Sequence, residues 1–185
     1  MGVSMYQSLI EFWFSDEASE RWFKSTPEFD RQLIERYSET WQAAKQRELD
    51  HWCDTATGSL AMVILLDQFP RNMFRGLAAA FRTDCRALRT AKQAIGRGHD
   101  KVTPEPERQF FYLPLMHSEG LPDQERCVRL IKLEMPQTGL ENLEHARRHR
   151  EVIRKFGRFP SRNRSLGRHD TEAELHYRAS GGYMS

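Results

Sequence analysis

The chain lacks the long apolar segments with which proteins enter or cross a membrane. None of its 185 residues belongs to a stretch near the roughly 20 apolar residues that a transmembrane helix needs. The amino-terminal residues also lack a basic region followed by an apolar segment, which is the pattern of a secretory signal. We therefore expect a soluble, cytoplasmic protein with no membrane partner.

Cysteine is scarce as well, and the common cofactor motifs are missing. The three cysteines, Cys53, Cys85 and Cys127, are widely spaced, so they predict neither a disulfide framework nor a zinc site. Gly96 and Gly98 lack the strand context and the lysine of a nucleotide-binding loop. These absences predict reduced thiols and no cofactor.

No segment alternates apolar and polar residues as a half-buried strand does. Apolar residues instead recur at three- and four-residue spacing, as between Phe29 and Ala44, and a similar stripe predicts one helix over residues 78–95. Thr103-Pro104 predicts another helix start, with a capping hydroxyl and a proline in the first turn. We expect a single all-α domain of about eight helices, stacked as helical hairpins, with an ordered core over residues 5–178 and a flexible tail over residues 179–185.

The segment Leu60–Leu66 is apolar on every side, which predicts a helix buried all round. Because proline disfavours helical geometry in the preceding residue, this helix is expected to end near Phe69. The break forms the first Phe-Pro corner, Phe69-Pro70-Arg71-Asn72, and a second Phe-Pro corner, Phe159-Pro160-Ser161-Arg162-Asn163, nearly repeats it. We predict that the two corners lie side by side.

Several aromatic and polar motifs also occur in a fixed order along the chain. They include Phe12-Trp13-Phe14, Leu66-Asp67-Gln68-Phe69-Pro70-Arg71-Asn72, Ala94-Ile95-Gly96-Arg97-Gly98-His99, Phe110-Phe111-Tyr112-Leu113-Pro114, His117-Ser118-Glu119 and Phe156-Gly157-Arg158-Phe159-Pro160. Together they resemble the bacterial domain-of-unknown-function family numbered 924, across roughly residues 9 to 177. The resemblance implies an all-α fold akin to tetratricopeptide-type superhelices, and it implies no established activity. The family pattern has histidine where this chain has Ser161.

Polar side chains gather at the predicted helix breaks and form the candidate site. The ligand-binding candidates are Asp67, Arg71, Asn72, Arg75, Gln124, His149, Arg158, Arg162 and Asn163, and the catalytic candidates are His117, Glu119 and Asp123. Arginine and asparagine supply donors suited to carboxylate or phosphate, and a histidine among carboxylates can move protons. The set predicts a small anionic ligand, with enzymatic activity left open. The alternative is a buried network in which the arginines of one corner pair with the acids of another.

Other ligand classes are less favoured by the sequence. His145 and His149 have a spacing that can hold a metal ion, but the arginines around them would repel a cation, so no metal site is predicted. From His145 to Arg168, nine lysines or arginines accompany one acid, Glu151. This basic segment can bind nucleic acid or dock onto the acidic remainder of the chain, and that acidic remainder disfavours nucleic acid. A helical groove that clamps a peptide is a further alternative.

Overall fold

The computed structural model describes residues 4–184, and within this range the chain forms helices and no strand. The predicted all-α class is therefore confirmed. The α-helices are α1 (Met5–Trp13), α2 (Asp16–Ser19), α3 (Pro27–Lys45), α4 (Ala56–Met73), α5 (Asp84–Gly96), α6 (Gln109–Met116), α7 (Leu121–Glu134), α8 (Leu140–Phe156) and α9 (Glu172–Ala179). Short 3-10 helices cover Asp50–Asp54, Ala78–Phe81 and Pro160–Arg162. None of the described helices is both long and apolar enough to span a membrane.

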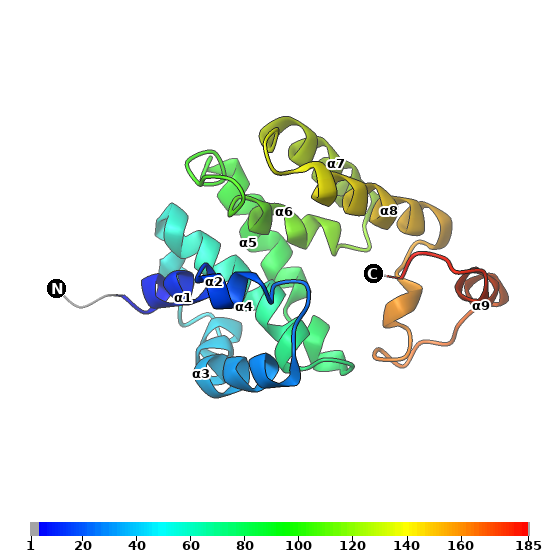
Figure 1. Ribbon diagram of the computed structural model, residues 1–185, viewed down its shortest axis with the longest axis horizontal. Helices are drawn as coiled ribbons and strands as arrows, with labels where there is room; N and C mark the ends of the chain where they lie inside the picture. Colours follow the sequence, from blue (N-terminus) through cyan, green and yellow to red (C-terminus); the bar gives the residue numbers. More distant parts are fainter. Residues whose placement is uncertain (1–3, 185) are drawn as a thin grey trace.

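Helix α4 lies at the centre of the fold and packs against α1, α3, α5 and α6 (Figure 1). Thr55 caps its first turn by accepting a hydrogen bond from the Gly58 amide at 3.0 Å. The segment Leu60–Leu66 is almost fully buried, as a helix that is apolar on every side requires. Helices α7 and α8 pack on each other along the far side of α6, so the chain builds outward from α4 (Figure 1).

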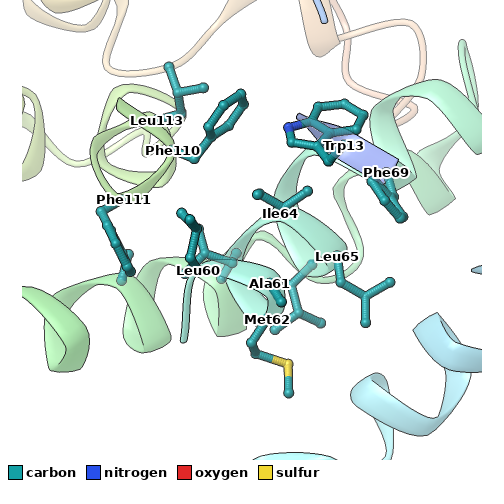
Figure 2. Close-up of a cluster of buried hydrophobic side chains, with 14 of the residues drawn as sticks. Trp13, Leu60, Ala61, Met62, Ile64, Leu65, Phe69, Phe110, Phe111 and Leu113 are labelled. Atoms are coloured by element: carbon teal, nitrogen blue, oxygen red, sulfur yellow. The ribbon is translucent and has the colours of Figure 1, made fainter. Parts of the chain in front are cut away.

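Aromatic side chains fill the space between α4 and the helices around it. Trp13 of α1 lies with its ring centroid 5.2 Å from that of Phe69 and 5.8 Å from that of Phe110. Figure 2 shows these rings gathered around Ile64 of α4. All four side chains are completely or almost completely buried. This cluster fixes the carboxyl-terminal end of α4, where the polar side chains of the candidate site begin.

The prediction that the central helix ends near Phe69 was wrong, because α4 continues through Pro70 to Met73. A proline inside a helix leaves the carbonyl four residues earlier without its amide partner. Here the Thr83 hydroxyl donates a hydrogen bond to that carbonyl, on Leu66, at 2.6 Å. Since the helix continues, Asp67 and Arg71 lie one turn apart on the same face.

Two further expectations need correction. Residues 78–95 do not form one helix, because the 3-10 helix Ala78–Phe81 ends before α5 begins at Asp84. Thr103-Pro104 precedes turns, and α6 starts only at Gln109. The flexible tail over residues 179–185 stays a prediction; within it, the Tyr183 hydroxyl lies 3.0 Å from a ring nitrogen of His145. Ser185, the end of that tail, lies outside the described residues.

Candidate functional site

An aspartate and a histidine form the centre of the site. Asp67, on α4, is 1% exposed, and His117 directly follows the last turn of α6. His117 Nδ1 lies 2.9 Å from both carboxylate oxygens of Asp67. Because a carboxylate only accepts hydrogen bonds, this contact places the ring proton on Nδ1. In a neutral imidazole the other nitrogen, Nε2, is then an unprotonated base.

Two arginines from the two Phe-Pro corners meet next to this pair. Arg71 donates to the Asp84 carboxylate at 2.9 and 3.2 Å, and Arg162 donates to the same carboxylate at 3.1 Å. Arg162 also donates to the His117 carbonyl at 2.8 Å. Both guanidinium groups lie over the Phe81 ring, at 5.9 and 4.8 Å from its centroid. The prediction that the two corners lie side by side is therefore confirmed.

The charges around the site hold His117 in its neutral form. Burial by itself would raise the pKa of Asp67, but the Arg71 guanidinium and His117 outweigh it and lower that pKa. Burial and the nearby Arg71 charge lower the pKa of His117, although Asp67 opposes them. Burial and Arg71 also lower the pKa of Arg162 to about 10. At neutral pH the site thus contains an ionised Asp67, a neutral His117 and two charged arginines.

His117 stands in the wall shared by two cavities, which together we call the His117 cleft. Trp22, Phe23 and Leu113 line both cavities with it. The polar arm has a volume of 190 Å³ and is also lined by Ser25, Gln68, Arg71, Asn72 and Arg75. The apolar arm has a volume of 600 Å³, and its further lining includes Pro106, Met116, His145, His149, Tyr183 and Met184.

The polar arm is suited to a negative charge. Its lining in the described part of the chain contains two arginines and no carboxylate. The acids that balance these arginines lie outside the lining, because Arg71 pairs with Asp84 and Arg75 pairs with Asp30 at 3.0 and 3.2 Å. An anion in this arm would therefore meet guanidinium and amide groups without facing a carboxylate.

His149 lies beside His117, with ring centroids 6.4 Å apart. Its Nδ1 donates to the His145 carbonyl at 2.8 Å, and its ring packs edge-on against Phe159 of the second Phe-Pro corner. Burial and the neighbouring His117 lower the pKa of His149 to about 3, so its ring is neutral. Among residues 4–184, no group of three or more histidine, cysteine or acidic side chains is arranged to hold a metal ion.

Seven of the predicted site residues lie outside the lining of the cleft. Asp67 and Arg162 contact His117 from behind the lining, and the other five hold the surrounding helices together. Glu119 accepts from the Phe159 amide at 2.9 Å and from Arg168, and Asp123 accepts from Ser118 and pairs with Lys92. Gln124 donates to the carbonyls of Leu115, Met116 and Ser118 at the end of α6. Arg158 pairs with Glu174, and Asn163 donates to Asp170 at 2.6 Å. Each of these five residues makes contacts of the kind that the buried-network alternative expects.

The basic segment from His145 to Arg168 is largely neutralised by the rest of the molecule. Its ion pairs join Arg148 to Glu144, Arg150 to Glu125, Arg154 to Glu125, Arg158 to Glu174, Arg162 to Asp84 and Arg168 to Glu119. The acids of all six pairs lie outside the segment, although Glu144 is only one turn earlier on α8. Within the segment, Arg150 and Arg154 also pair with Glu151. These contacts dock much of the segment onto the acidic remainder of the chain.

Sequence reasoning missed Asp84, which joins the two corners, and the aromatic wall formed by Trp22 and Phe23. Asp84 lies on an otherwise ordinary amphipathic helix, so only its contacts show its role. The sequence shows Trp22 and Phe23 as adjacent aromatic residues, but only the structure shows that Phe23 is 64% exposed.

The fold and the site define an all-helical protein with an aspartate-oriented histidine in a two-armed cleft. The chain belongs to the family described as bacterial protein of unknown function (DUF924), whose family model matches residues 9–182. Among solved structures, the protein of unknown function ATU0120 from Agrobacterium tumefaciens is similar. The two chains are 40% identical with a TM-score of 0.89, and the match covers 96% of this chain and 98% of that one. A comparison with curated proteins gave no match.

Proposed function

We propose that the His117 cleft binds a small amphipathic acid and that His117 removes a proton from the bound molecule or from a water beside it. The observation that carries this proposal is the position of His117, which Asp67 orients through Nδ1 in the wall between a cationic and an apolar cavity. The same residue thus meets both halves of an amphipathic ligand.

The two arms of the cleft suit the two chemically different halves of such a ligand. A carboxylate or phosphate headgroup fits the polar arm, where Arg71, Arg75 and Gln68 supply donors. The apolar body fits the larger arm, whose walls include Phe23, Leu113 and Met116. Volumes of 190 and 600 Å³ match a small molecule better than an extended peptide.

The chemistry of His117 follows from its protonation state. A general base is most effective when its basic nitrogen is free at the working pH and its orientation is fixed. Asp67 fixes the ring through Nδ1, and Nε2 makes no hydrogen bond to any residue from 4 to 184. No cysteine lines either arm, and Ser25 is the one serine in the polar arm, so among the residues of the described lining His117 is the group best placed to act on a ligand.

The test is a thermal-shift panel of aryl and alkyl carboxylates and phosphate monoesters, each beside its neutral alcohol or amide. We expect acids to raise the melting temperature and their neutral analogues to leave it unchanged, because only the acids use the polar arm. Arg75→Leu should abolish the shift. Arg129→Leu, which changes an exposed arginine on α7, is the matched control. Equal shifts with neutral analogues, or none with any acid, would overturn the proposal.

A further inference from the structure

A second cavity, separate from the His117 cleft, is lined by several charged side chains, most of which are arginines. It has a volume of 440 Å³ and lies between the end of α3, the 3-10 helix Asp50–Asp54 and α5. We call it the cationic cavity. Its basic lining residues are Lys45, Arg47, Arg82, Arg86, Arg89 and Arg97, and its acidic ones are Asp50 and Asp54. None of its lining residues belongs to the lining of the His117 cleft.

The acids of this cavity do not balance its cations. Asp50 is shared between Arg47, at 3.2 Å, and Arg86. Arg97 donates at 2.9 Å to the Cys53 carbonyl, which is polar but uncharged. Arg82 and Arg89 form no ion pair within residues 4–184. Like charges gathered in a concave site raise the free energy of the folded protein unless an anion binds among them.

Arg86 is held in place in the wall of the cavity by hydrogen bonds. Its side chain is 19% exposed and donates both to the Ala44 carbonyl, in the last turn of α3, and to Asp50. Burial lowers the pKa of Arg86, and although Asp50 opposes this, the charges of Arg47 and Arg89 add to it. The guanidinium is thus held in one orientation and surrounded by too little negative charge, which is the condition for binding a phosphate oxygen.

We propose that the cationic cavity binds a small molecule that carries several phosphate groups. A single monovalent anion would leave most of the excess charge of six cations over two carboxylates unbalanced, whereas a di- or triphosphate would balance it. A nucleic-acid backbone fits less well, because the cavity is concave and bounded and because Asp50 and Asp54 would face the continuing phosphate chain. This proposal does not depend on the proposed binding of an acid in the His117 cleft.

Cys85 supplies a probe of occupancy inside the cavity. It is exposed and lines the cationic cavity, whereas Cys127 is buried elsewhere. Alkylation by iodoacetamide, a neutral reagent, is followed at the Cys85 peptide by mass spectrometry as inorganic triphosphate is added. We expect alkylation to slow as the site fills and the melting temperature to rise over the same concentrations.

Matched arginine variants separate a built site from diffuse attraction. The double variant Arg82→Gln/Arg89→Gln removes two cations without breaking an ion pair, so it should fold normally and bind triphosphate about tenfold more weakly or worse. Arg129→Gln on α7 removes an exposed arginine outside the cavity and should bind like the parent, as should Arg75→Leu in the His117 cleft.

Three results would overturn the proposal. The first is that triphosphate at millimolar concentration neither protects Cys85 nor raises the melting temperature. The second is that Arg129→Gln weakens binding as much as the double variant, which would show diffuse attraction. The third is that a single-stranded oligonucleotide binds more tightly as its length increases, with Cys85 protected in parallel, which would assign the surface to nucleic acid instead. Because the variants of the two cavities are distinct, failure here leaves the proposal for His117 standing.

Discussion

The two Phe-Pro corners share a sequence pattern but not a backbone conformation. Pro70 lies inside α4, whereas Pro160 opens the 3-10 helix Pro160–Arg162. Arg71 therefore pairs with an acid on its own helix, Asp67, as well as with Asp84. Arg162 reaches Asp84 and the His117 carbonyl from outside the α4 bundle, with its guanidinium 4.7 Å from the centroid of Phe159.

The difference shows that similar arginines can have different energetic roles. Arg71 is the cation nearest to Asp67, which is almost fully buried. Arg162 adds a second cation to Asp84, which Arg71 already neutralises. We infer that the first corner neutralises the buried Asp67 carboxylate. The second corner adds hydrogen bonds to Asp84 and to the His117 carbonyl. The predictions that follow test this division.

Arg71→Ala should cause the largest loss. It leaves the buried Asp67 carboxylate with two neutral partners, Gln68 and His117, and stranding a buried charge costs about 3–5 kcal/mol. Denaturant unfolding at pH 7 measures the change. Adding Asp67→Asn to this variant removes the stranded charge and should recover part of the loss. A loss no larger than that of Arg162→Ala would contradict the division between the corners.

Arg162→Ala should cost less, about 2–3 kcal/mol. It removes charge-assisted hydrogen bonds and the contacts with Phe81 and Phe159, but Asp84 keeps Arg71 as its partner. The same unfolding experiment checks the value. A cost above that of Arg71→Ala would show that the second corner, rather than the first, neutralises the buried acids.

His149, which packs on the second corner, should make stability depend on pH. Its pKa is about 3 in the folded protein and about 6.5 when unfolded, so between these values the unfolded chain binds a proton that the folded chain excludes. Stability therefore falls as pH falls, by about 2 kcal/mol for this residue between pH 8 and pH 5. His149→Phe should show a smaller difference between unfolding free energies at these two pH values. Equal differences in the two proteins would rule out this role.

Arg75→Ala should have the smallest effect on stability, within about 0.5 kcal/mol. Its side chain is 58% exposed, and exposed ion pairs such as the one with Asp30 contribute little. Asp30 also keeps the Ser25 hydroxyl, at 2.6 Å, as a partner. Thermal melts without ligand check this value. A loss comparable to that of Arg162→Ala would make Arg75 part of the structural network rather than of the ligand arm.

The sequence predicted the parts of the structure that depend on local pattern. The all-round apolar segment Leu60–Leu66 is enough to predict a buried helix, and the repeated Phe-Pro pattern is enough to place the corners together. The continuation of α4 through Pro70 was not predictable, because it depends on the hydroxyl of Thr83 from another part of the chain. The role of Asp84 was not predictable for the same reason, because its partners Arg71 and Arg162 lie elsewhere in the sequence.

Asp67 holds His117 as a neutral base whose Nε2 makes no hydrogen bond to residues 4–184. The most direct measurement is a pH titration by NMR of the ¹⁵N-labelled imidazole rings, with His117 assigned from His117→Gln and Asp67→Asn as the comparison. The structure predicts that at pH 7 Nδ1 carries the proton, that Nε2 is unprotonated, and that the pKa of His117 lies below the ordinary value of about 6.5. A doubly protonated ring at pH 7, or a proton on Nε2 in place of Nδ1, would show that Asp67 does not hold His117 as a neutral base in this orientation.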